Sequence, residues 1–208
     1  MSNSPVQRLL TLPIDGLRPT QITVGFKDVE LKRLTIRSLI VKADRLYNYL
    51  NAKRVSVVIG PGKIPYIVDG HALVRALYET RLQAAHCVVL EDYSTVATQD
   101  AFWEKMYSRR WVFPFDSDGH GPLPFSAIPL HVKDMTDDPF KSLASAVQRS
   151  GGFLPPSQPQ DEWEWVQYLR SRVHGDPNAN MPGALVDASH AAHMIEAAAL
   201  PGFIPPGW

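Results

Sequence analysis

The chain has 208 residues, of which 45% are hydrophobic and 20% are charged, a composition typical of a soluble globular protein with a sizeable core. Its 21 Lys and Arg residues balance 21 Asp and Glu residues, and the pI is about 7.1. Neutralised phosphates supply most of the affinity of non-specific nucleic-acid binding, so this balance of charges argues against a DNA-binding protein. The overall charge does not reveal whether a local basic groove is present.

The first half of the chain alternates between short apolar runs and amphipathic segments. These patterns predict strands at residues 21–25, 55–60, 64–68 and 86–90. They predict helices at residues 28–37, 44–50, from 71 onward and 94–109. The turn at residues 61–63 joins two of the strands into a hairpin.

The second half begins with residues 111–132, a segment rich in Pro, Gly and aromatic residues that predicts a long loop. Asp138 followed by Pro139 is a typical helix start, and the Gly pair at 151–152 is the matching stop. Further helices are predicted at residues 160–172 and 184–200. The sequence therefore indicates an α+β fold, with one domain at residues 1–135 and a helical extension at 136–208 packed on it.

Targeting signals and cysteine chemistry are sparse. The N-terminal residues lack the apolar stretch of a signal peptide, and no run approaches membrane-spanning length, so we expect a cytoplasmic protein without a membrane partner. The single cysteine, Cys87, can form neither an internal disulfide nor a Cys-based zinc site. We expect it to be a small buried strand residue.

The most informative segment is the turn Asp69-Gly70-His71, which ends a predicted strand and begins a predicted helix. The first turn of a helix has unpaired N–H groups at the positive end of the helix dipole, and this combination suits a phosphate or carboxylate. Gly70 allows a close approach of the backbone to a ligand, and His71 adds a donor or a proton carrier. The same residues also fit a simple helix cap with a surface histidine.

Charged neighbours extend this candidate site. Asp69 can orient a base, hold a metal or cap the helix, and Arg75 lies one helical turn beyond His71, so both can reach one anionic group. Lys32 is a second source of positive charge. A solvated surface lysine is the alternative interpretation.

Two groups of residues raise the question of a metal. Asp187, His190, His193 and Glu196 recur every three residues on a predicted helix, but each step of three drifts about 60° round the helix, so only neighbouring pairs share a face. Asp116, Asp118 and His120 in the long loop can ligate a divalent cation, but Asp and Gly clusters also simply form turns. We assign no metal ligands.

Several segments together resemble the family known as "Putative ParB-like nuclease", which belongs to the wider ParB/sulfiredoxin fold. The resemblance covers nearly the whole chain. It rests on residues 17–25, 29–32, 66–71, 73–77, 102–106, 138–144, 151–152 and 199–202.

The resemblance implies a small mixed sheet flanked by helices, in which the helix after the Asp-Gly-His turn holds nucleotide phosphates. Members of the wider fold use ATP to repair a cysteine sulfinic acid, bind and hydrolyse CTP, or phosphorylate free serine. From these relatives we expect ATP or another nucleotide with Mg²⁺ as cofactor. An acidic residue near the first strand, Glu30 or Asp28, is a candidate base, and Thr20 and Gln21 are candidate nucleotide-binding residues.

The chain departs from its relatives at informative positions. His71 occupies the place of the reactive cysteine of sulfiredoxin, which argues against repair through a thiol. Only Gly70 and Arg75 match the Gly-Glu-Arg-Arg box of ParB, and Ala72 stands where close relatives have a second histidine. The last third shows no basic recognition helix, which argues against chromosome segregation.

These observations favour an enzyme that binds nucleotide phosphate and performs phosphoryl transfer or nucleotide hydrolysis on a small-molecule substrate. His71, Asp69 and Glu30 are its predicted catalytic residues. Its predicted nucleotide-binding residues are Gly70, His71, Arg75, Lys32, Thr20 and Gln21. The alternatives are a metal-dependent nuclease and a non-catalytic nucleotide-binding module.

Overall fold

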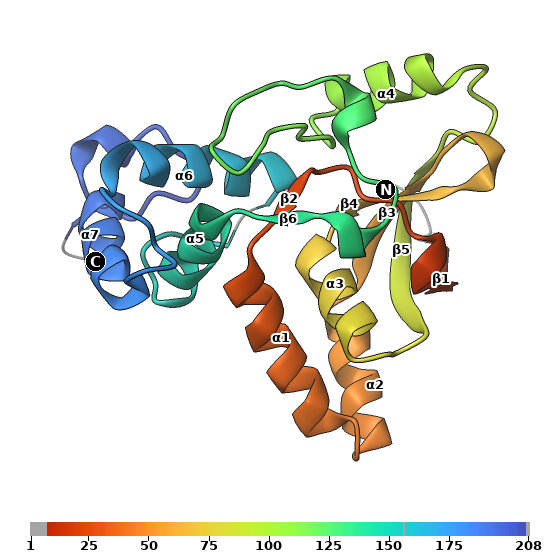
Figure 1. The fold of residues 1–208 in the computed structure, drawn as a ribbon, viewed down its shortest axis with the longest axis horizontal. Coiled ribbons are helices and arrows are strands. Elements are labelled where there is room, and N and C mark those ends of the chain that lie inside the picture. The colour runs from red at the N-terminus through yellow and green to blue at the C-terminus, as the bar shows by residue number, and fades with distance from the viewer. Residues whose placement is uncertain (1–7, 156, 207–208) are drawn as a thin grey trace, which may run out of the picture. The chain divides into compact units, whose positions relative to one another are not determined.

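The computed structural model describes residues 8–155 and 157–206, and Figure 1 shows its ribbon. The chain forms two compact units. The first contains residues up to 22, 29–114 and 122–135, and the second contains residues 23–28, 115–121 and those from 136 onward. Two short segments from the earlier part of the chain are thus built into the second unit.

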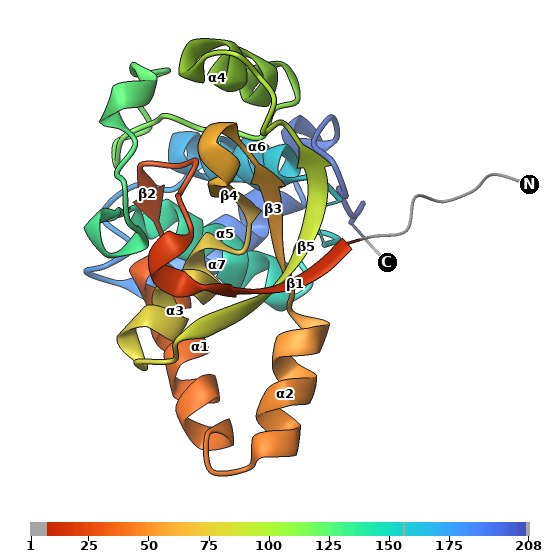
Figure 2. The same ribbon diagram turned by 90° about the vertical axis from the view of Figure 1, so that its right-hand side faces the viewer.

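The first unit is organised around a four-stranded sheet with the strand order β1–β5–β3–β4, seen in Figure 2. Its strands are β1 (Arg8–Pro13), β3 (Val55–Ile59), β4 (Pro65–Asp69) and β5 (Ala84–Asp92). β5 pairs antiparallel with β1 and parallel with β3, while β3 and β4 form an antiparallel hairpin, so the sheet is mixed. The hairpin turn needs Gly62, whose φ is 68°.

The other elements of the first unit are helical. They are α1 (Phe26–Leu39, which begins in the second unit), α2 (Ala43–Ala52), α3 (His71–Glu79) and α4 (Gln99–Ser108), with short 3₁₀ turns at Ile14–Gly16, Pro61–Lys63, Phe125–Ala127 and Val132–Asp134. α3 buries Leu73, Val74 and Leu77 on one face, as its apolar spacing predicts. On α4, Phe102 and Met106 are fully buried in a cluster with Tyr66 and Val68 of β4.

The second unit is mainly helical. Its elements are the parallel strand pair β2 (Thr23–Val24) and β6 (Thr136–Asp137), the helices α5 (Pro139–Arg149), α6 (Pro159–Arg172) and α7 (Met181–Ala192), and a 3₁₀ turn at Ile195–Ala197. Its core contains Leu143, Trp165 and Ala188, and the ring of Trp165 stacks on Phe153 with centroids 4.1 Å apart. The small side chains of α7 allow this helix to pack closely.

The predicted α+β class is confirmed, and most predicted elements are present with shifted ends. The helix predicted at 94–109 begins only at Gln99, because the Thr98 hydroxyl accepts the Ala101 N–H and caps it there. The helix predicted at 184–200 begins at Met181, where the Asn180 side chain caps it, and ends at Ala192. The prediction missed β1, whose residues are exposed or only half-buried, and β6, which has two residues.

Within residues 8–155 and 157–206, no helix is long and apolar enough to cross a bilayer.

Candidate functional site

The turn between β4 and α3 has the geometry that the sequence predicts. Gly70 adopts a left-handed conformation with a φ of 97°, and its N–H donates to Oδ1 of Asp69 at 2.7 Å. A Cβ at Gly70 would lie 3.4 Å from the Val55 Cα, an ordinary contact, so the left-handed backbone is what favours glycine here. The N-cap residue of α3 is Gly70, which has no side chain to cap the helix, so the first turn of α3 presents the positive end of the helix dipole at this turn.

His71 is the first residue of α3, and its side chain is buried, with 5% of the residue exposed. The backbone N–H of Thr20 donates to His71 Nε2 at 3.1 Å, so Nε2 is unprotonated and the neutral ring carries its proton on Nδ1. The Thr20 hydroxyl donates to the Ile67 carbonyl at 2.6 Å and lies 3.4 Å from the same ring nitrogen. The structure thus brings Thr20, predicted as a nucleotide contact, against His71.

Arg75 is held by other parts of the first unit. Its Nε donates to Glu79 Oε1 at 2.7 Å, and its Nη1 donates to the carbonyl oxygens of Val132 and Lys133 at 2.9 and 2.8 Å. These contacts attach the segment that follows the long loop to α3. The predicted phosphate contact of Arg75 stays a prediction, and its present contacts are those of a positioning residue.

The remaining predicted residues lie on neighbouring segments. Glu30 on α1 pairs with Arg33, whose Nε donates to it at 2.6 Å, and Lys32 is half-buried on the same helix. Gln21 forms an isolated parallel bridge with Phe113. Glu30 and Asp69 make no hydrogen bond with each other in the described part of the chain, so their joint action stays a prediction.

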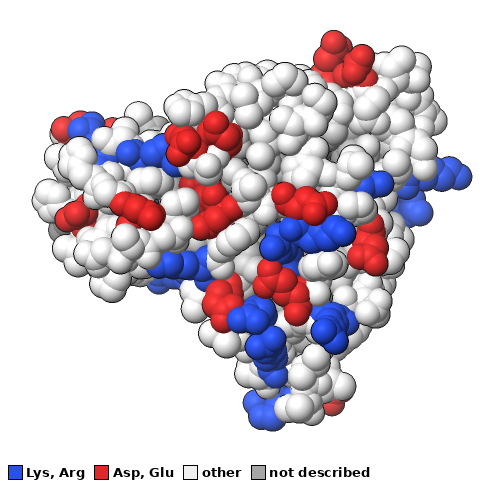
Figure 3. Space-filling view, viewed as in Figure 1, with Lys and Arg blue, Asp and Glu red and all other residues white. Residues whose placement is uncertain are grey.

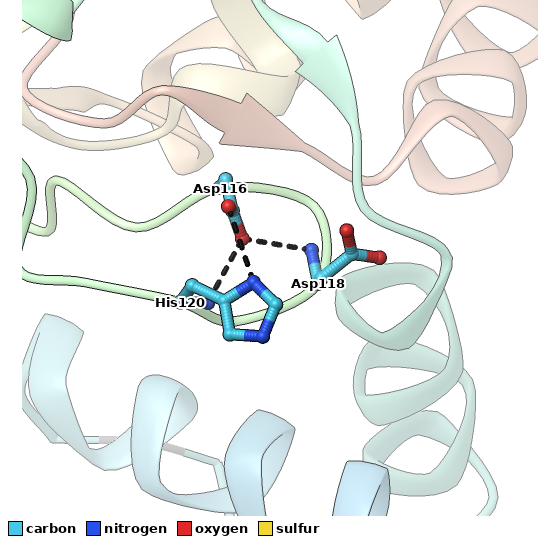
Figure 4. Close-up of side chains that lie close together, drawn as sticks. All are labelled: Asp116, Asp118 and His120. Atoms are coloured by element: carbon cyan, nitrogen blue, oxygen red, sulfur yellow. Dashed lines mark hydrogen bonds and ion pairs between the residues drawn. The ribbon is translucent and has the colours of Figure 1, made fainter.

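The loop residues Asp116, Asp118 and His120, in the second unit, are drawn in Figure 4. One potential ligand atom from each lies within 4.8 Å of the others. Asp116 Oδ1 already accepts the N–H groups of Asp118 at 3.0 Å and His120 at 2.8 Å, and the His120 backbone contact lowers the pKa of the Asp116 carboxyl. This pattern is that of a tight turn, and a cation would have to share the same carboxylate.

The prediction missed a buried ionic cluster in the second unit. Asp138, which is fully buried, caps α5 and accepts Nη2 of Arg170 at 2.7 Å, while Lys141 donates from Nζ to the Thr23 carbonyl at 2.8 Å. Desolvation raises the pKa of Asp138 and lowers that of Lys141 to about 8. Asp138-Pro139 identified the cap, but no sequence signal distinguishes Lys141 or Arg170 from surface cations.

The mixed sheet, the helices around it and the Asp-Gly-His turn define a protein of the ParB/sulfiredoxin-like fold. The family model described as "Putative ParB-like nuclease" matches residues 10–171, and the chain belongs to this family. The chain is also similar to a protein of Agrobacterium tumefaciens known from a crystal structure, with 35% identity and a TM-score of 0.84. That match covers 97% of this chain and 99% of the other. A search of curated proteins found no match.

Proposed function

We propose that this protein is an enzyme that binds a nucleotide through its phosphates at the first turn of α3. The observation that carries the proposal is the left-handed Gly70 before a helix without a side-chain cap. Backbone N–H groups and the positive end of the helix dipole together favour an anion at this place. We propose phosphoryl transfer or nucleotide hydrolysis on a small-molecule substrate as the reaction, because such chemistry depends mainly on positioning and electrostatics.

Each residue of the turn has its own role in the proposed reaction. Gly70 allows the phosphate to approach the backbone, and His71 contacts the transferred group or moves a proton through Nδ1. Asp69 is exposed and uses Oδ1 to hold the turn, so its carboxylate can also orient a nucleophile or bind Mg²⁺. Glu30 is the proposed base, and Lys32 with Thr20 and Gln21 the proposed further nucleotide contacts.

Calorimetric titration with ATP, ADP and CTP, each with Mg²⁺, tests the binding step. We expect micromolar binding of at least one nucleotide and at least about tenfold weaker binding in Gly70→Ala, since the added Cβ strains the turn. Gly62→Ala is the matched control, because Gly62 has the same sign of φ and a Cβ there would make only ordinary contacts, at 3.8 Å, with the Ile64 side chain. Absence of binding by all three nucleotides would refute the proposal.

Product analysis separates an enzyme from a binding module. Incubation of the protein with the bound nucleotide and small-molecule acceptors, followed by phosphorus NMR, should show release or transfer of phosphate. Saturable binding without any product would instead identify a non-catalytic nucleotide-binding module.

A metal-dependent nuclease is the second candidate, favoured by the placement of Asp116, Asp118 and His120 within 4.8 Å. On the face drawn in Figure 3, acidic and basic side chains are interspersed, so that face offers no continuous basic surface for a nucleic acid. The test is cleavage of single- and double-stranded DNA and RNA with Mg²⁺ or Mn²⁺. Cleavage that a chelator and Asp118→Asn both abolish would support a nuclease over the nucleotide enzyme.

A further inference from the structure

The first unit contains a cavity of about 580 Å³ whose lining includes neither the Asp-Gly-His turn nor any predicted site residue. This volume lies within the range of small-molecule binding sites. Its walls come from three parts of the chain: residues 18–19 with the start of β4, the first turns of α4, and residues 125–130 of the long loop. Part of the segment predicted as a long loop thus closes one side of the cavity.

One wall of the cavity is aromatic. The rings of Trp103 and Phe125 stack at 5.4 Å with an interplanar angle of 20°, and Tyr66 meets the edge of Trp103 at 5.3 Å. Because each ring supports the next, the wall is a preformed apolar surface. Such a surface binds an aromatic or branched aliphatic group without much loss of side-chain freedom.

Opposite charges line the same cavity. Arg18 donates from Nη1 to the Leu130 carbonyl at 2.7 Å, which fixes its guanidinium at the cavity, and Asp100 lies in the first turn of α4. In the described part of the chain neither residue forms an ion pair, with the other or elsewhere. Gln99 accepts a long hydrogen bond from the Tyr66 hydroxyl at 3.4 Å, and its amide NH₂ adds a donor to the cavity.

We propose that this cavity binds a zwitterion with an apolar side chain, namely a free α-amino acid such as phenylalanine or leucine. Its carboxylate pairs with Arg18, its ammonium group pairs with Asp100, and its side chain packs on Trp103 and Phe125. A simple anion would face Asp100, a simple cation would face Arg18, and a neutral apolar molecule would form an ion pair with neither residue. Only a ligand with both charges satisfies the two residues together.

The proposal is independent of nucleotide binding, and ligand analogues test it on the unmodified protein. L-phenylalanine, L-leucine, phenylalaninamide and 3-phenylpropionate are titrated by calorimetry up to millimolar concentrations. We expect at least one of the two amino acids to bind. We expect the amide, which lacks the carboxylate, and the propionate, which lacks the ammonium group, each to bind at least about tenfold more weakly than L-phenylalanine.

Variants then assign the two charges. Asp100→Asn, a nearly isosteric change at an exposed residue, should weaken L-phenylalanine binding at least about tenfold and should not weaken 3-phenylpropionate binding, because it removes a carboxylate that repels this anion. Glu104→Gln is the matched control, since Glu104 is an exposed carboxylate on the same helix outside the cavity lining. The proposal is overturned if neither amino acid binds, if 3-phenylpropionate binds as tightly as L-phenylalanine, or if Asp100→Asn and Glu104→Gln behave alike.

Discussion

Thr20 and His71 are 51 residues apart in the chain, yet the Thr20 N–H donates to His71 Nε2 at 3.1 Å. This hydrogen bond joins the segment before α1 to the first residue of α3 and sets the tautomer of a buried ring. A histidine that transfers a proton here must do so from Nδ1. His71 therefore holds the candidate site together as well as offering it a functional group.

Replacing His71 by Ala should reduce both stability and activity. The Thr20 N–H loses its acceptor in a buried place and a cavity is left, so we expect the free energy of unfolding to fall by about 2–4 kcal/mol in urea unfolding. Turnover should fall about 10²-fold or more if the ring transfers a proton. His120→Ala is the control, because the His120 side chain is 77% exposed and its loss should change stability by less than about 0.5 kcal/mol. Wild-type turnover in a folded His71→Ala protein would remove His71 from the mechanism.

Arg75→Met should destabilise the first unit. The carbonyls of Val132 and Lys133 lose their charged donor, and we expect a loss of about 1–3 kcal/mol in urea unfolding. Arg37→Met, on the exposed surface of α1, should have little effect. Nucleotide affinity measured by calorimetry separates the two roles. Weaker nucleotide binding by a folded Arg75→Met protein would establish that Arg75 contacts phosphate. Lower stability of this variant with unchanged nucleotide affinity would establish that Arg75 is a positioning residue.

The buried Lys141 should make stability rise with pH in the alkaline range. Below pH 8 its amine is protonated in the folded and unfolded chains alike. Between pH 8 and the ordinary pKa of 10.5, the unfolded chain keeps a proton that the folded chain releases, so the free energy of unfolding increases with pH. Urea unfolding as a function of pH should show this increase in the wild type and its loss in Lys141→Met.

The wild type and Lys141→Met must be compared at each pH because Cys87 has the opposite effect on how stability changes with pH. Burial raises the pKa of its thiol to about 12 from 9.0, which reduces stability as the pH rises above 9.0. The contribution of Lys141 is therefore the difference between wild type and Lys141→Met at each pH. Lys53→Met, which changes an exposed lysine, should follow the wild type. Parallel curves for wild type and Lys141→Met would contradict the prediction.

Cys87 should be unreactive in the folded protein. It is 1% exposed, and its raised pKa leaves almost no thiolate at about pH 8, whereas the thiolate is the reactive form. We expect a thiol-specific chromogenic disulfide to react slowly with the native chain. In concentrated guanidinium chloride, which unfolds the chain, the same reagent should react with one equivalent of thiol. Rapid reaction of the native protein would show that β5 opens readily.

Local signals in the sequence determined much of this fold. Asp138 before Pro139 predicts the start of α5, short apolar runs predict β3 and β4, and Asp69-Gly70 predicts the turn before α3. Each signal acts within a few residues, because caps, turns and short apolar runs depend on neighbours in the chain. The same locality explains the failure at β1, which is stabilised by its pairing with β5.

Only the tertiary structure decided which of these residues meet. The partner of His71 is 51 residues away, and the Val132 carbonyl that holds Arg75 is 57 residues away. The composition likewise shows 21 cations without showing that one of them, Lys141, is buried with a pKa of about 8. Burial and long-range contacts depend on how the whole chain packs, so the sequence by itself determined the turn that makes a candidate site, and the tertiary structure decided the partners that surround it.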